Sequence, residues 1–212
     1  MKRKLKIEIG LAVLLLLIAL FGSFLAPYDP LKVNYDFSLQ PPSFLHIFGT
    51  DKLGRDVFSR ILCGAKTSFG LTFLMLFLIV FIGMIVGLIA GLSNDKVESF
   101  FNNIINGLLA FPDTIFAIAI VGIVGAGLFN TVFALALIWW TKYARLTLAL
   151  VKQEKKKNYL VISKMSGVPP LQRIIRYLLP NILSQILVTA FLDIGNMMIS
   201  LAGLSFLGLA SQ

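Results

Sequence analysis

Five long apolar segments constrain the fold of this chain more than any other feature. They cover residues 10–27, 68–92, 101–124, 129–150 and 181–208. A helix rises about 1.5 Å per residue, so each segment is long enough, the first only just, to cross a hydrocarbon core about 30 Å thick. Helices are required there because the backbone must satisfy its own hydrogen bonds in lipid. The sequence therefore predicts an all-α membrane protein with five transmembrane helices.

Composition and charge agree with a membrane protein and argue against other classes. The chain is 58% hydrophobic and 14% charged, whereas soluble domains carry about 25% charged residues. The net charge of +9 is confined to the N-terminus and two loops, which is typical of membrane topology and not of nucleic-acid binding. A single cysteine, Cys63, excludes an internal disulfide. A lone histidine, His46, in a polar loop is expected to be solvated, with metal contact as the alternative.

The basic residues predict the orientation of the helices. Cytoplasmic placement of residues 1–9, Lys96 and the basic stretch 142–176, which runs into the basic loop 151–180, puts fourteen Lys/Arg, Lys142 among them, inside and five in the external loop 28–67. The N-terminus resembles a signal peptide, but we interpret residues 10–27 as an uncleaved anchor because PYDP follows directly. An odd number of spans then leaves Gln212 outside.

The basic loop predicts a helical elbow over residues 152–172. Gly167 suits the end of one short helix, because glycine accepts a left-handed conformation. Pro169 and Pro170 suit the first turn of the next helix. We expect an elbow hinged at Gly167–Val168 to bind a soluble partner and to transmit the partner's movement to the membrane helices. Its expected apolar face consists of Val161, Met165 and Val168.

This loop resembles the "EAA loop" of permease subunits in bacterial ABC importers. Gly167 and the pair Leu179–Pro180 match the spacing of that pattern. The triplet positions are Val161, Ile162 and Ser163, so the signature glutamate is absent. The resemblance implies that these residues, together with Met165, Val168, Pro169 and Pro170, contact a partner ATPase.

Further blocks resemble the dipeptide/oligopeptide/nickel permeases within these importers. They are GTDKLGRDVFSRI (49–61), AFPDTIF (110–116) and SLAGLSFLGL (200–209). LVISKMSG (160–167) and LDIGNMMISLAGLSFLGL (192–209) are most similar to nickel permease subunits of the C type. The resemblance implies a type I ABC importer transmembrane domain. That family normally has six transmembrane helices, so we expect this chain to be truncated before the last one.

The resemblance implies nickel, free or chelated, as the substrate, with di- or oligopeptides as the alternative. It also implies a second permease subunit in a heterodimer, two ABC ATPases and an external substrate-binding protein, all at the bacterial cytoplasmic membrane. The chain has no GxxxxGK[ST] run, so ATP and magnesium are expected on the partner ATPases and no cofactor on this chain. An intramembrane enzyme is not supported, because the sequence has no HExxH motif, no Ser/His pair in the apolar segments and no histidine cluster. A secondary transporter would favour an internal repeat and intramembrane ionisable pairs, and neither is evident.

Acidic residues inside apolar segments are the candidate pathway residues. Asn196 and Met197 follow Asp193 at helical spacing, so the three share a face. Two interpretations remain open for this face, an interhelical hydrogen-bond cluster or the lining of the translocation path. Asp113 follows Pro112 and is expected to cap a restarted helix.

Two further patterns predict helix contacts. Leu53, Val57 and Ile61 recur at four-residue spacing, which predicts an amphipathic helix on the outer leaflet, capped by Asp51 or Thr50. The resemblance places the external binding protein against it, at Asp51, Gly54, Arg55 and Asp56. The glycines Gly83, Gly87 and Gly91 form a GxxxG pattern that permits close helix packing.

Overall fold

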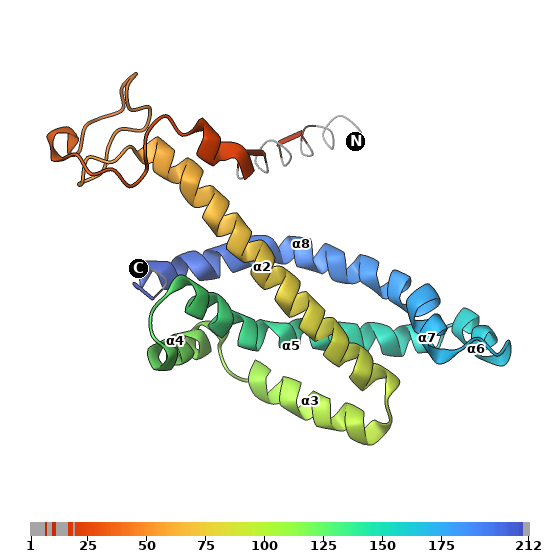
Figure 1. Cartoon of the computed structure of the whole chain (residues 1–212). Coiled ribbons are helices and arrows are strands. Elements are labelled where there is room, and N and C mark those ends of the chain that lie inside the picture. The colour runs from red at the N-terminus through yellow and green to blue at the C-terminus, as the bar shows by residue number, and fades with distance from the viewer. Residues whose placement is uncertain (1–6, 8–9, 12–16, 19, 210–212) are drawn as a thin grey trace. The chain divides into compact units, whose positions relative to one another are not determined.

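The computed structural model describes residues 7, 10–11, 17–18 and 20–209, and within these ranges every regular element is a helix (Figure 1). The chain divides into two compact units, Met1–Leu71 and Thr72–Gln212. Helix α2 (Val57–Leu92) begins in the first unit and ends in the second.

The first unit is mostly irregular between residues 26 and 56. Its short helix η1 (Tyr35–Phe37) is capped by Asn34, whose side chain accepts a hydrogen bond from Asp36 N at 3.2 Å. Residues 50–56 form a turn closed by an isolated bridge between Thr50 and Asp56. Gly54 has a φ of 70°, and a Cβ there would lie 1.7 Å from Asn34 O. This close approach fixes the turn against the segment that precedes it.

The predicted amphipathic helix over 49–61 is therefore wrong in its first half. Residues 50–56 are a turn, and α2 begins only at Val57, so Leu53 does not share a helical face with Val57 and Ile61. Neither Asp51 nor Thr50 caps α2. Asp56 does, by accepting a hydrogen bond from Ser59 N at 2.8 Å. The left-handed Gly54 and the local hydrogen bonds of Asp51 outweigh the weak apolar period.

The second unit contains the remaining helices. They are α3 (Asp95–Leu109), α4 (Asp113–Val124), α5 (Leu128–Lys155), α6 (Asn158–Met165), α7 (Pro170–Arg173), the π-helix η2 (Ile174–Leu178) and α8 (Leu179–Phe206). The expected span 101–124 is not one straight helix, because α3 and α4 are bent by 85° at their junction. Pro112 lies in this break and precedes the first residue of α4, as expected for a proline that cannot continue a helix.

Three helices of the described residues are long and apolar enough to cross a membrane, namely Val57–Leu92, Leu128–Lys155 and Pro170–Phe206, and the bent pair would make a fourth. The expected span 10–27 lies partly outside the described residues. The expected spans 68–92 and 129–150 fall within α2 and α5, and the expected span 181–208 extends two residues beyond the end of α8.

Helix α5 is the centre of the second unit. Its side chains at Ala134, Leu135, Ala144 and Val151 are completely buried, and α3, α4 and α8 surround it (Figure 1). It runs antiparallel to α8, because the residue before α5, Gly127, donates to Leu209 O beyond the end of α8 at 2.8 Å.

The expected glycine contact seam is confirmed between α2 and α5. A Cβ at Gly83 would lie 2.6 Å from Trp140 O, and one at Gly87 would lie 2.5 Å from Thr147 Cβ. A Cβ at Gly91 would meet Val151 Cγ1 at 2.8 Å. These distances are shorter than van der Waals contact, so only glycine lets the two backbones lie this close.

Candidate functional site

A buried ion pair links the middle of α5 to the middle of α8. Asp193 accepts hydrogen bonds from Lys142 Nζ at 2.8 and 2.7 Å, one to each carboxylate oxygen. The Tyr143 hydroxyl donates to the same carboxylate at 2.9 Å. The Asp193 side chain is 7% exposed, whereas that of Lys142 is 50% exposed. Three donated hydrogen bonds thus stabilise the carboxylate inside an apolar bundle.

The antiparallel register of α5 and α8 brings these residues together. Lys142 lies about halfway along α5 and Asp193 about halfway along α8. In an antiparallel helical hairpin, residues at similar distances from the connection lie at the same level. Lys142 and Tyr143 are adjacent in sequence and both reach Asp193, one from the edge of the contact and one from the buried side.

The ion pair lines a cavity of ≈ 440 Å³. Two of the three candidate pathway residues, Asp193 and Asn196, line this cavity. Asp113 lines it as well. Its remaining walls are mainly apolar and come from Leu109, Phe111, Ile138, Trp139, Ile199 and Ser200. The site is a mixed surface of aromatic, aliphatic and paired charged groups, which is typical of small-molecule sites.

Met197 does not belong to this cavity. Its side chain is completely buried and is absent from the cavity lining. The three residues of the predicted face therefore differ in environment: Asp193 and Asn196 line the cavity, whereas the Met197 thioether is buried in the core of the helical bundle. Among the described residues, no group of three or more His, Cys, Asp or Glu side chains is placed to hold a metal ion.

The contacts of Asp193 favour the first of the two interpretations, an interhelical hydrogen-bond cluster, over an unpaired carboxylate that lines the translocation path. Both carboxylate oxygens are occupied by donors from α5. Sequence reasoning missed Lys142, because this residue was counted among the cytoplasmic lysines although it lies within α5. The signal was present, since one lysine and one aspartate occur in the two apolar segments that flank the basic loop. The intramembrane ionisable pair that seemed absent from the sequence therefore exists.

Asp113 acts locally but does not cap α4 as expected, because the N-cap position is Pro112 and no side chain makes a cap hydrogen bond there. It is the first residue of α4, and its carboxylate accepts hydrogen bonds from Thr114 N at 2.8 Å and Thr114 Oγ1 at 3.2 Å. A carboxylate in the first turn of a helix also interacts favourably with the helix dipole.

The basic loop forms the predicted elbow, but only α6 is a separate short helix, because α7 continues through η2 into α8 and Pro170–Phe206 is one helix. Helix α6 ends at Met165 and α7 begins at Pro170. Between them Gly167 adopts a φ of 72°, and Val168 N donates to Ser163 O at 3.1 Å. Gly167 thus provides the left-handed residue that ends α6, and the proline pair starts α7 as expected.

The triplet positions of the EAA-like pattern have different environments. Val161 and Ile162 are 48% and 60% exposed, whereas Ser163 is 6% exposed and donates to Leu160 O at 2.8 Å. The expected apolar face is partly wrong, because Val168 is only half-exposed. The exposed apolar side chains of the elbow are Val161, Ile162, Met165 and Leu171. Leu179 and Pro180 begin α8 and extend the connection into the membrane helix.

A buried glutamate stabilises the connection between α5 and the elbow. Glu154 accepts a hydrogen bond from Lys157 Nζ at 2.6 Å and another from the Tyr159 hydroxyl. Asn181, in α8, donates to the Tyr159 oxygen at 3.2 Å. Burial and the hydrogen bond to Glu154 raise the pKa of Tyr159 to about 12. Tyr159 therefore remains a neutral donor at physiological pH and joins α5, α6 and α8.

The external candidates lie in the first unit and form a local network. Asp51 accepts hydrogen bonds from Leu53 N at 2.9 Å and Arg55 N at 3.0 Å, and forms ion pairs with Arg55 and Arg60. Burial opposes ionisation, but the hydrogen bonds from Arg55 and Leu53 outweigh it and lower the pKa of Asp51 to about 2. These donors hold the turn of residues 50–56 in shape.

His46 was expected to be solvated, but it is largely buried. Its side chain is 12% exposed, and Nδ1 lies 2.9 Å from Asp56 Oδ1. The Asp56 side chain is 2% exposed, and the hydrogen bonds from Ser59 and His46 lower its pKa despite burial. Of the four predicted docking residues, Asp56 and the closely packed Gly54 therefore support the turn, while Asp51 and Arg55 remain partly accessible.

Comparisons with known proteins identify the family. Residues 83–212 match the model of the binding-protein-dependent transport system inner membrane component, and residues 9–42 match the N-terminal TM domain of oligopeptide transport permease C. The nickel transport system permease protein NikC of Escherichia coli (strain K12) is 35% identical over 92% of this chain and 71% of the relative.

Two other relatives are named for different substrates. The di/tripeptide transport system permease protein DppC of Pseudomonas aeruginosa is 38% identical over 96% of this chain and 70% of the relative. The glutathione transport system permease protein GsiD of Shigella flexneri is 37% identical over 94% of this chain and 66% of the relative. This chain therefore belongs to the binding-protein-dependent inner membrane components, the permease subunits of ABC importers.

Proposed function

We propose that this chain is one of two membrane subunits of an importer that carries nickel, bound in a small organic chelate, across the bacterial cytoplasmic membrane. The observation that carries the proposal is the cavity around Asp193 and Lys142. Its aromatic and aliphatic walls suit the organic part of a chelate, and Asn196 and Ser200 offer hydrogen bonds to polar atoms. The segments 160–167 and 192–209, which resemble nickel permeases, support the same substrate.

Di- or oligopeptides are the second candidate substrate. A zwitterionic peptide carries one carboxylate and one ammonium group, and Lys142 and Asp193 present the opposite charges side by side. Relatives named for di/tripeptides and for glutathione are as similar to this chain as the relative named for nickel. The cavity volume of ≈ 440 Å³ lies within the range of about 300–1,000 Å³ that is usual for small-molecule sites.

The proposed energy source is a pair of partner ATPases that grip the elbow. Ile162, Met165 and Leu171 are 60%, 83% and 68% exposed, which is unusual for large apolar side chains outside a membrane or an interface. A short helix that presents such side chains fits a hydrophobic groove on a partner. A second permease subunit and an external binding protein complete the proposed importer, with docking near Asp51 and Arg55.

Uptake by the assembled importer tests the substrate. Vesicles containing this chain, its partner permease, its ATPases and the binding protein would be given radioactive nickel, with and without a small organic chelator, or a labelled dipeptide. We expect ATP-dependent accumulation of chelated nickel. Accumulation of dipeptide without nickel would show that the second candidate is correct. Asp193→Asn, which removes the charge and keeps the size, separates the two roles of Asp193: reduced uptake by an assembled complex supports the cavity as the path, whereas normal uptake leaves Asp193 as an interhelical contact.

A further inference from the structure

A second cavity of ≈ 540 Å³ lies where α2 and α5 end and α6 and α7 begin. Its apolar walls include Leu92 from α2, Leu160 from α6 and Leu178 from η2. Three cationic residues, Lys155, Lys164 and Arg173, line the same cavity. The cavity therefore has apolar walls and three positive charges, and it lies at the ends of helices that are long and apolar enough to cross a membrane.

The positive charge of this cavity is not balanced by the residues that line it. The lining contains no carboxylate, and the nearby acidic residue of the basic loop, Glu154, is engaged by Lys157 and Tyr159. Among the described residues, Arg173 Nε is buried without a hydrogen-bond partner. A buried, unpaired guanidinium nitrogen is costly, and an anionic ligand would satisfy it.

The cavity shares only Val161 with the exposed apolar side chains of the elbow. Ile162 and Met165, the most exposed apolar side chains of α6, do not line it. Lys155 lies at its edge, where Nζ donates to Gly91 O in the last turn of α2 at 3.0 Å. The cavity thus lies at the end of α2, a helix long and apolar enough to cross a membrane.

We propose that this cavity binds an anionic phospholipid. The lipid phosphate would lie between Lys164 and Arg173, and an acyl chain would follow the apolar walls formed by Leu92, Leu160 and Leu178. Basic pockets between transmembrane helices are suited to anionic headgroups, and arginine pairs with phosphate through several donors. This inference concerns regulation by the bilayer and goes beyond the proposed transport function.

Lipid binding to the purified full chain tests the proposal. The delipidated protein in detergent would be titrated with dioleoyl phosphatidylglycerol or dioleoyl phosphatidylcholine and followed by native mass spectrometry. We expect selective retention of phosphatidylglycerol. Lys164→Gln/Arg173→Gln should weaken that binding by roughly 30-fold, since each basic residue near a lipid surface contributes about a fivefold preference. Binding of phosphatidylcholine should not change.

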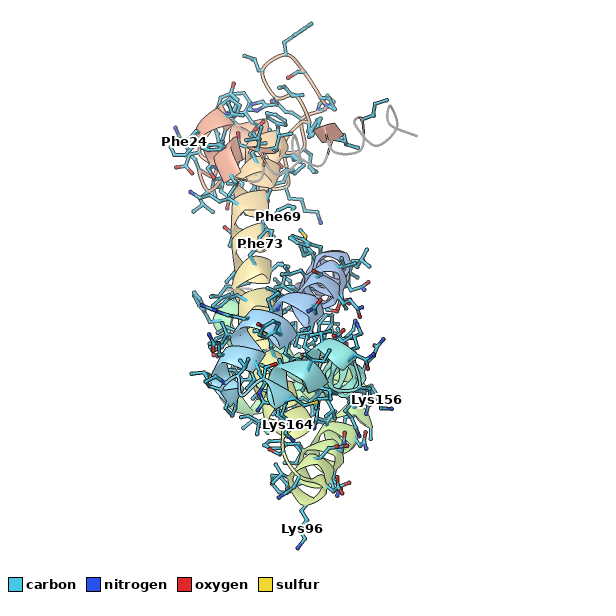
Figure 2. The ribbon with its side chains drawn as sticks, turned by 90° about the vertical axis from the view of Figure 1, so that its right-hand side faces the viewer. Phe24, Phe69, Phe73, Lys96, Lys156 and Lys164 are labelled. Carbon is cyan, nitrogen blue, oxygen red and sulfur yellow. The ribbon has the colours of Figure 1, made fainter. Side chains whose placement is uncertain are left out.

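A matched control variant separates a site from diffuse attraction. Lys156→Gln/Arg176→Gln removes the same charge from the same basic loop, but these exposed residues do not line the cavity; Lys156 and Lys164 are both labelled in Figure 2. The control should bind phosphatidylglycerol like the wild type. Lys164→Arg/Arg173→Lys keeps both charges and should also retain binding of phosphatidylglycerol. This result would show that the loss in the glutamine variant is due to the charges and not to the substitution itself.

Four results would overturn the proposal. They are equal loss of phosphatidylglycerol in the control, equal retention of phosphatidylcholine by the wild type, displacement of the lipid by the same concentration of soluble glycerol phosphate, or undiminished binding of phosphatidylglycerol by Lys164→Gln/Arg173→Gln. Uptake assays do not enter this test, so it can fail or succeed independently of the proposed substrate.

Discussion

Replacing Gly87 with alanine tests whether the backbones of α2 and α5 are in direct contact. A Cβ at Gly87 would lie 2.5 Å from Thr147 Cβ and 2.6 Å from Ala144 O. Ordinary contacts of a Cβ are 3.4–4 Å, so the helices would have to separate by about 1 Å. The Ala144 oxygen belongs to the backbone of α5 and cannot rotate away, so relief by a side-chain movement is not available.

Two opposing contributions set the expected loss of stability. Overpacking a closely packed contact costs about 1–3 kcal/mol. Alanine in place of glycine within a helix stabilises it by about 0.5–1 kcal/mol. The net effect of Gly87→Ala is therefore a loss of up to about 2.5 kcal/mol in the free energy of unfolding. For a chain of this size, that corresponds to a melting temperature lower by up to about 10 °C.

Thermal unfolding of the purified chain in detergent would measure this loss. Trp139 and Trp140 lie on α5, so their fluorescence reports on the affected helix. The control is Gly107→Ala in α3, because a Cβ there meets nothing within 4 Å. Equal or higher melting of Gly87→Ala than of Gly107→Ala would refute the contact. The double variant Gly83→Ala/Gly87→Ala should lose less than the sum of its parts, because one separation of the helices relieves both clashes.

Three other predictions concern the ion pair, the elbow and the external turn. Lys142→Met should destabilise the chain in the same melting assay by about 1.5–3 kcal/mol, because the buried Asp193 carboxylate keeps only the hydrogen bond from Tyr143. Lys142→Met/Asp193→Leu should recover much of that loss, and no recovery would contradict a direct pair. Gly167→Val should strain the left-handed turn by about 1 kcal/mol or more and uncouple ATP hydrolysis from uptake, so normal coupled transport would argue against the elbow as the coupling element. The pKa of Asp51 is lowered to about 2 in the folded chain from about 3.9 in an unfolded one, so its stabilising effect is complete above about pH 4 and is lost as the pH falls toward 2. Cleavage of the external turn by pepsin should therefore increase across that window, and Asp51→Asn should reduce the dependence on pH, with the remainder due to Asp56.

The sequence by itself determined the class of fold and the form of the elbow. Apolar length requires helices in lipid, and α2, α5 and α8 follow the segments that predicted them. Gly167 and Pro170 mark the end of α6 and the start of α7 as expected. These features depend on local backbone chemistry, namely the left-handed conformation of glycine and the missing N–H of proline.

Local patterns were less reliable where close packing competes with them. The apolar period at Leu53, Val57 and Ile61 predicted a helix from residue 50, but the contact of Gly54 with Asn34 O keeps residues 50–56 in a turn. The helix-breaking effect of Pro112 was visible in the sequence, whereas the 85° bend between α3 and α4 depends on how α4 packs against α5.

Only the tertiary structure decided the partner of Asp193. Helical spacing grouped Asp193 with Asn196 and Met197, but the structure pairs it with Lys142 and Tyr143 from another helix and buries Met197 in the core. The glycine pattern indicated a close contact without naming α5 as the partner. Sequence spacing describes one helix at a time, whereas the register between α5 and α8 depends on the length and shape of the elbow that connects them. That register determines which charges meet inside the membrane.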